Sequence, residues 1–107
     1  MVKKPEVEAS VHLLKTLPEN FNKVATGVMS FQLRKNDRDY KLNDILVLQE
    51  YVGSVHDEDQ YTGRQFVCRV NCILTEDDGL QQNYVLLNIS KIHLFGNRAG
   101  LRYETKL

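Results

Sequence analysis

Apolar positions recur at every second residue, or run almost unbroken, in five segments of the chain, and both patterns predict β-strands. The segment 29–34 alternates strictly, with Met, Phe and Leu on one face and Ser, Gln and Arg on the other. That alternation is typical of a half-buried strand. The segment 45–51 is almost wholly apolar and predicts a central strand, and the segments 11–15, 65–75 and 84–92 complete the set.

One helix is predicted early in the chain, over residues 17–26. Thr16 offers a hydroxyl cap, Pro18 stands in the first turn, and Glu19 follows it, which is a common way for a helix to begin. Apolar side chains then recur at helical spacing as far as Gly27, where a left-handed glycine would end the helix.

The order of these elements predicts a mixed α+β fold, mostly β, with one short helix after the first strand. A small β-barrel is the expected form, and an open sheet with the helix on one face is the alternative. The length of 107 residues fits a single domain over 11–107, after a flexible N-terminal arm over 1–10. The acidic segment 52–63 predicts an exposed loop, and 101–103 predicts an edge strand or a trailing end.

Charge and composition narrow the classes of partner and the compartment. Fourteen basic and fourteen acidic residues cancel, so any nucleic-acid binding would depend on a local basic patch. No apolar run has the length of a membrane span and the start lacks a signal peptide, so a cytoplasmic protein without a membrane partner is expected. Cys68 and Cys72 are about 13 Å apart along a strand and predict free, buried thiols.

The polar face of the segment 29–34 and the basic turn after it form the main candidate binding surface. Ser30, Gln32 and Arg34 project on one face of the strand and offer a hydroxyl, an amide and a guanidinium. Such a set suits a phosphate together with the edge of a base. The full set of candidate ligand-binding residues is Lys15, Ser30, Gln32, Arg34, Lys35, Arg38, Tyr40 and Arg64.

Acidic neighbours give a competing interpretation of the same surface. Arg34 could pair with Asp37, Asp39 or Asp44 and brace the turn, which would then be a solvated surface of ion pairs. A structural role for Arg64 in closing a hairpin is as good an explanation of this residue as ligand binding.

No catalytic, metal-binding or cofactor-binding residue is predicted. The acidic run 56–59 contains one histidine, but its spacing matches no calcium or zinc loop. The sequence has no glycine-rich phosphate loop and no nucleophile motif.

The run 27–34, with a short helix before it and the segments 35–40 and 44–46 after it, resembles the signature of the ASCH domains of the PUA-like superfamily. In particular, it is similar to an uncharacterised branch found in bacteria and their phages. The likeness extends from about residue 11 to residue 92. It implies a PUA-like β-barrel, a cleft between the early helix and the barrel, and binding of RNA or modified nucleotides.

Departures from the family pattern bear on catalysis. The pattern has lysine at Met29, glutamate or threonine at Gln32 and usually glycine at Asn43, whereas Gly27 and Arg34 are retained. One enzymatic branch hydrolyses an acylated cytidine through the lysine and the threonine. A thioether and a carboxamide cannot take over their proton transfers. The sequence therefore predicts a non-enzymatic module that binds RNA or a nucleotide.

Two other functions remain open at this point. An enzyme hydrolysing a modified nucleoside would have to use Lys15 or Glu50 in place of the missing groups. A phage or mobile-element protein that binds a host protein would fit the neutral net charge.

Overall fold

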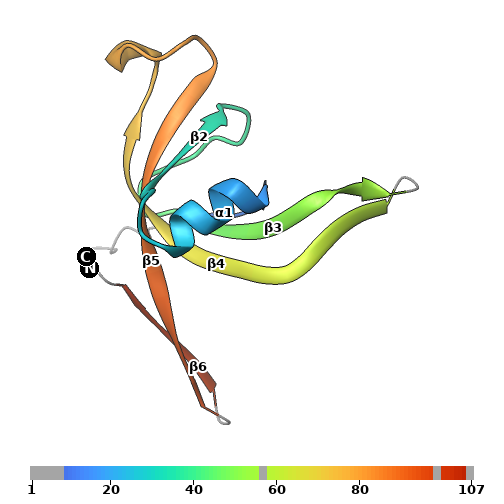
Figure 1. Ribbon diagram of the computed structural model, residues 1–107. Coiled ribbons are helices and arrows are strands. Elements are labelled where there is room, and N and C mark those ends of the chain that lie inside the picture. Colours follow the sequence, from blue (N-terminus) through green and yellow to red (C-terminus); the bar gives the residue numbers. More distant parts are fainter. Residues whose placement is uncertain (1–8, 56–57, 98–99, 106–107) are drawn as a thin grey trace, which may run out of the picture.

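One sheet of six strands and one α-helix make up the described part of the chain, residues 9–55, 58–97 and 100–105 of a computed structural model (Figure 1). The elements in chain order are β1 (Val11–Thr16), α1 (Pro18–Ala25), β2 (Phe31–Lys35), β3 (Ile45–Val55), β4 (Glu58–Leu74), the 3-10 helix η1 (Glu76–Asp78), β5 (Tyr84–Asn97) and β6 (Gly100–Thr105). The strand order is β1-β3-β4-β5-β2, and β6 pairs with β5. β1 is parallel to β3, and the other pairs are antiparallel.

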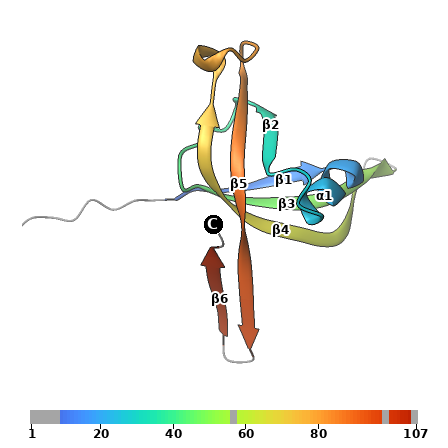
Figure 2. The ribbon, with the colours of Figure 1, turned by 60° about the vertical axis from the view of Figure 1, so that its left-hand side comes forward.

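The sheet curls into a half-barrel, and two hairpins, β3–β4 and β5–β6, project from it in different directions (Figure 2). β1 and β2 are the edge strands of the main path, and in the described residues no backbone pairing joins them. The mostly β fold with one short helix is therefore confirmed, but the closed barrel is not formed. An open seam separates β1 from β2.

The core fills the concave side of the half-barrel. β1 alternates strictly between exposed and buried positions, so that Leu14 is buried whereas Leu13 is exposed. The helix α1 contributes Phe21 and Val24, both 2% exposed. The core cluster comprises Leu14, Val24, Tyr40, Leu46, Leu48, Cys68, Val70, Val85, Leu87 and Ile89. Each large side chain buried in this way contributes about 1.5–3 kcal/mol.

The helix α1 begins as predicted near Pro18, but the predicted Thr16 cap is wrong. Leu17 occupies the cap position, and it forms no side-chain capping hydrogen bond. The Thr16 hydroxyl instead donates to the carbonyl of Leu14 (3.3 Å) and accepts from Arg34 (3.2 Å). Proline needs no acceptor for a backbone N–H, so a helix starting on it depends less on a cap.

Strand β2 turns its apolar residues outward, which is the reverse of an ordinary half-buried strand. Phe31 and Leu33 are 43% and 56% exposed, whereas Gln32 is 2% exposed. The cause is the register with β5, which pairs Gln32 with the buried Leu87. A shift by one residue would reverse both faces. The polar face of β2 therefore faces the seam and the interior.

The segment 52–63, predicted as a loop, is mostly strand. β3 continues to Val55 and β4 begins at Glu58, so the two form a long ribbon in which Tyr51 pairs with Tyr61. Backbone pairing holds a two-stranded ribbon together without a buried face. The sequence of this ribbon therefore lacks the alternation of apolar and polar residues from which a strand is predicted.

The two cysteines have different environments. Cys68 is fully buried, and its burial raises the thiol pKa to about 12, so this thiol is unreactive at neutral pH. Cys72 is exposed, which corrects the prediction of two buried thiols. The reason is a register irregularity between Val70 and Cys72, because a bulge shifts the following residues to the other face of the strand.

Two turn positions that flank the polar strand require a left-handed backbone. Gly27 has φ of 79° and Asn43 has φ of 71°. Glycine and asparagine adopt this conformation at lower cost than other residues. That preference explains why glycine and asparagine stand at these two positions.

Candidate functional site

Arg34 reaches from β2 across the seam to β1. Its Nη1 donates to the carbonyl of Lys15 (3.0 Å), and its Nη2 donates to Thr16 Oγ1 (3.2 Å) and Gln32 Oε1 (2.8 Å). All three acceptors are neutral, and no carboxylate among the described residues forms an ion pair with Arg34. Its burial lowers the guanidinium pKa, because burial disfavours the charged form. A half-buried cation thus stands without a full counter-charge.

Arg38 makes a parallel contact with the same edge. Its Nη1 donates to the carbonyl of Leu13 (2.8 Å), two residues before the Lys15 carbonyl that Arg34 binds. Alternate carbonyls of an edge strand point to its unpaired side. The two arginines therefore satisfy the β1 edge where a further strand would otherwise pair.

Two adjoining hollows share Arg34. The larger, here called the seam cleft, has a volume of about 470 Å³ and is lined by Lys15, Thr16, Leu17, Asn20, Met29, Phe31, Gln32, Leu33 and Arg34. The smaller, the turn cleft, has a volume of about 210 Å³ and is lined by Leu14, Arg34, Lys35, Asp37, Arg38 and Tyr40.

The structure brings most of the predicted binding residues to these two hollows. Three line the seam cleft (Lys15, Gln32 and Arg34), and Arg34 shares the turn cleft with three more (Lys35, Arg38 and Tyr40). Ser30 and Arg64 are not among the described residues that line either one.

Gln32 is built into the wall of the seam cleft. Its Oε1 accepts from Arg34 and its Nε2 donates to the carbonyl of Phe31 (3.0 Å). The side chain is therefore fixed in orientation and, at 2% exposure, lines the cleft beside Arg34.

The turn cleft is predominantly cationic. Lys35, Arg38 and Arg34 face one carboxylate, that of Asp37. Tyr40 closes the cleft from the core side, because the residue is 8% exposed and its ring packs on His12 at 4.7 Å between centroids. Its burial raises the pKa of the phenol. Tyr40 thus supports the cleft and leaves little ring surface on which a base could stack.

Arg64 lies at a separate place, where a carboxylate balances its charge. Its Nε and Nη2 donate to the two oxygens of Glu50, both at 2.9 Å, and Nη2 also donates to Asn22 Oδ1 (3.1 Å). The guanidinium lies over the Phe21 ring, 4.8 Å from its centroid. The hydrogen bonds from Arg64 and Thr62 lower the pKa of Glu50. This arrangement joins β3, β4 and α1.

Asp44 does not pair with Arg34 either, because it is held by the start of β1. It is fully buried and binds His12 Nε2 (2.7 Å) and the backbone N–H groups of Ser10 (3.0 Å) and Lys41 (2.9 Å). Burial alone would raise its pKa, but these hydrogen bonds outweigh burial and lower it. Ser10, the last residue of the expected N-terminal arm, is thereby fixed, and residues 1–8 lie outside the described residues.

The two residues considered for an alternative catalytic site have structural contacts. The Lys15 ammonium lies 4.8 Å from the centre of the Tyr51 ring. Glu50 is ionised and bonded to Arg64 and Thr62, which leaves it poorly suited to accept a proton from a substrate.

Sequence reasoning missed two polar residues of the seam cleft, Thr16 and Asn20. Thr16 was assigned to capping, and Asn20 lies inside the predicted helix. The turn of the helix that faces β2 depends on how α1 packs on the sheet, which no local pattern reveals. The position of Thr16 beside a helix start was the one available signal.

Within the described ranges, no group of three His, Cys, Asp or Glu side chains could hold a metal ion. The acidic run 56–59 falls partly outside those ranges, at residues 56 and 57. No helix in the part of the chain that the structure describes is long and apolar enough to cross a membrane.

Comparison with known proteins gives matches that cover most of the chain. The family model "Domain of unknown function (DUF3850)" matches residues 11–89, which include both clefts and the Arg64–Glu50 pair. An Escherichia phage P2 protein, described as "Uncharacterized 12.9 kDa protein in GpA 3'region", is 34% identical over 80 residues. The match covers 75% of this chain and 68% of the phage protein.

Proposed function

We propose that this chain, which belongs to the DUF3850 family, binds RNA or a nucleotide in the seam cleft and the turn cleft. The observation that carries the proposal is the state of Arg34. Its guanidinium is half buried, has only neutral hydrogen-bond acceptors and forms a wall shared by the two hollows. An anion placed there would meet a partly desolvated cation, where charge-assisted hydrogen bonds are strong.

The turn cleft suits the phosphate. Three cationic side chains, those of Arg34, Lys35 and Arg38, surround it with one carboxylate, so its local charge is positive although the whole chain is neutral. Arg38 can present a fork to two phosphate oxygens, since only one N–H of its Nη1 has a partner among the described residues, and lysine adds a flexible point charge. Both N–H groups of Arg34 Nη2 are already in use, so Arg34 would contribute its charge and single hydrogen bonds. A local patch of this kind is what a neutral protein needs in order to bind a nucleic-acid backbone.

The seam cleft suits the base or nucleoside. Its volume of about 470 Å³ lies within the range of small-molecule sites, about 300–1,000 Å³. The exposed Asn20 supplies a carboxamide, the buried Gln32 and Thr16 hold Arg34 in place, and Met29 and Phe31 supply apolar surface. A carboxamide both donates and accepts, so it can pair with the edge of a base.

We further propose that the half-barrel is a PUA-like fold of the ASCH type. The support is the resemblance of the sequence together with the position of the seam cleft between the start of α1 and the curled sheet, where that resemblance implies a ligand. Met29 lines the cleft at the position of the lysine of the enzymatic branch. A thioether transfers no proton, so we propose binding without hydrolysis.

Titration followed by amide chemical shifts tests the proposal. Nucleoside monophosphates, the matching nucleosides and a short single-stranded RNA are added to the chain, to Arg34→Gln and to Lys23→Gln. Lys23 is an exposed residue of α1 outside both clefts, so it controls for the loss of one positive charge. We expect Arg34→Gln to weaken phosphate-containing ligands by about tenfold or more, as loss of a charge-assisted hydrogen bond predicts.

The Lys23→Gln variant should retain wild-type affinity within about twofold, since exposed charges contribute little. The matching nucleosides, which lack the phosphate, should bind more weakly and should lose less affinity than the monophosphates on the Arg34 substitution. Shifts that map away from β2, the turn 36–40 and the start of α1, or equal affinities of the wild type and Arg34→Gln, would contradict the assignment.

A further inference from the structure

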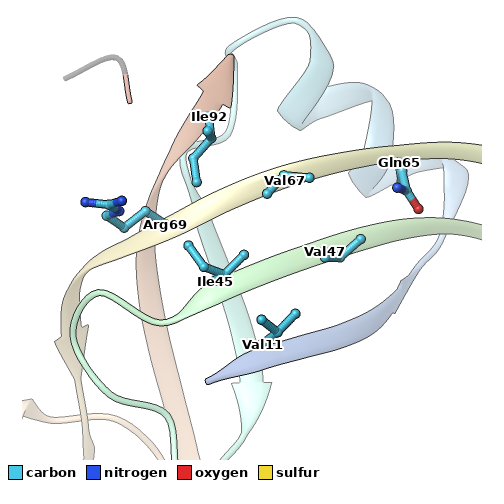
Figure 3. A pocket seen from close by; sticks show the side chains of 7 residues that line it. All are labelled: Val11, Ile45, Val47, Gln65, Val67, Arg69 and Ile92. Atoms are coloured by element: carbon cyan, nitrogen blue, oxygen red, sulfur yellow. The ribbon is translucent and has the colours of Figure 1, made fainter. Parts of the chain in front are cut away.

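A third hollow lies on the outer face of the sheet, opposite the core and α1. It has a volume of about 470 Å³, and Figure 3 shows its lining residues, which come from β1, β3, β4 and β5. This outer groove is lined by Val11, Ile45, Val47, Gln65, Val67, Arg69 and Ile92. None of the residues proposed to bind RNA or a nucleotide is part of it, so it is a separate surface.

The outer groove is unusual because the sheet is apolar on both faces there. A sheet that exposes one face to water normally alternates apolar and polar residues. β1 instead places Val11 (61% exposed) and Leu13 (55% exposed) on the outside, and β3 adds Ile45 and Val47 beside them in register. The near-continuous apolar run of β3 thus serves two faces, of which the core covers one. A contiguous exposed apolar patch commonly marks a contact with another molecule.

Arg69 is a polar residue of the outer groove, and one of its N–H groups lacks a hydrogen-bond acceptor in the described part of the chain. It lies in the same cross-strand row as Ile45 and Val11. Its Nε is buried, and among the described residues it has no hydrogen-bond partner. An unpaired buried N–H costs free energy, and an incoming acceptor would recover it once the Arg69 side chain turned this N–H toward the groove. Because the donor belongs to a guanidinium, a carboxylate is the acceptor with the best match of charge and geometry.

We propose that the outer groove docks an extended segment of another protein, whose apolar side chains pack on Val11, Val47 and Val67 and whose Asp or Glu pairs with Arg69. Among the described residues that line the groove there is no carboxylate, so a two-fold contact between two such surfaces would leave both Arg69 side chains without an anion. RNA is disfavoured as the occupant because the described lining offers one cation on an apolar floor, which gives little to a phosphate backbone. The charge pattern therefore selects an acidic, apolar peptide.

Selection of displayed random peptides on the full chain tests this docking site. We expect the enriched peptides to alternate apolar residues and to carry an acidic residue at a constant position. A synthetic peptide of the enriched sequence should bind Arg69→Gln and Arg69→Glu about tenfold or more weakly, whereas Lys23→Gln should bind it as the wild type does. Replacing the acidic residue of the peptide by lysine should restore binding to Arg69→Glu.

Thermal unfolding of each variant shows whether it is folded, and Arg69→Gln provides the readout if Arg69→Glu is not. Enriched peptides without an acidic residue, or a peptide that binds Arg69→Gln as tightly as the wild type, would overturn the proposal. Sedimentation equilibrium measures whether the chain forms a dimer through the outer groove. A dimer that Val47→Lys dissociates would identify a second copy as the occupant and would also overturn it.

Discussion

Two charged groups lie against strand β1, one near each end, and their surroundings are opposite in kind. Asp44, near the start of β1, is fully buried and accepts hydrogen bonds from His12 and from the backbone of Ser10 and Lys41. Arg34, near the end of β1, is half buried, donates only to neutral acceptors and lines two hollows.

The difference separates a structural charge from a binding charge. Asp44 has a histidine partner and two backbone donors, so it has no need of a ligand and connects the start of β1 to the turn before β3. Arg34 donates three of its five N–H groups to neutral acceptors, so its charge is not neutralised. Arg64, which the sequence ranked beside Arg34, belongs with Asp44, since Glu50 neutralises it.

The largest effect is expected where the structural charge is removed. Asp44→Ala leaves two backbone N–H groups and His12 without their acceptor in a buried site. We expect the free energy of unfolding to fall by about 3 kcal/mol, as measured by urea denaturation. Nucleotide affinity, measured under conditions where the variant is folded, should remain close to that of the wild type. A decrease in the free energy of unfolding of less than about 1 kcal/mol would show that the hydrogen bonds of Asp44 do not hold the start of β1 in place.

Arg34→Gln should reduce ligand affinity strongly and stability only moderately, the opposite of what is expected for Asp44→Ala. The substitution removes hydrogen bonds to the Lys15 carbonyl, Thr16 and Gln32, of which the first is exposed and the other two are partly buried. All three acceptors are neutral, so the free energy of unfolding should fall by about 1–2 kcal/mol, less than for Asp44→Ala. Urea denaturation measures this loss beside that of Asp44→Ala. If Arg34→Gln proved the more destabilising of the two, Arg34 would be mainly a structural clamp of the half-barrel.

Lowering the pH should reveal how much ionised Asp44 contributes to the stability of the fold. Its pKa is lowered in the folded chain, so its stabilisation is complete above the unfolded value of about 3.9 and is lost as the pH falls through the folded value. The urea midpoint of the wild type should therefore decrease below about pH 4. Asp44→Asn cannot titrate there and should show a shallower decrease. Identical pH profiles for the two proteins would exclude this role of Asp44.

The smallest effect is expected for Arg38→Gln. Arg38 is exposed and donates one hydrogen bond to the Leu13 carbonyl, so its loss should cost about 0.5 kcal/mol of stability. Its effect on RNA affinity, followed by titration, should be smaller than that of Arg34→Gln because water screens an exposed charge. An effect on affinity larger than that of Arg34→Gln would show that Arg38, and not Arg34, is the main phosphate contact of the turn cleft.

The strands and the helix were predictable where one local pattern was sufficient. The almost wholly apolar segment 45–51 lies within β3, and Pro18 with the apolar spacing after it marks α1. The faces were harder to predict, because they depend on register. Gln32 faces inward since β5 sets the register of β2, and Cys72 is exposed since β4 has an irregularity after Val70.

The candidate site was predictable as a set of residues but not as an arrangement. Gln32 and Arg34 share a face by simple alternation, and the structure places both in the seam cleft. The partner of each charge could not be predicted, because Arg64 meets Glu50 and Asp44 meets His12 only through the fold. Pairing between residues distant in sequence is a property of topology, and local spacing carries no information about it.

The most direct test of the central claim is the salt dependence of RNA binding by the wild type and by Arg34→Gln. Each phosphate contact contributes about one unit to the slope of the logarithm of the affinity against the logarithm of the salt concentration. The account predicts that Arg34→Gln binds a single-stranded RNA more weakly at low salt and with a slope smaller by about one. An unchanged affinity and an unchanged slope would contradict the claim that Arg34 is the phosphate-binding group.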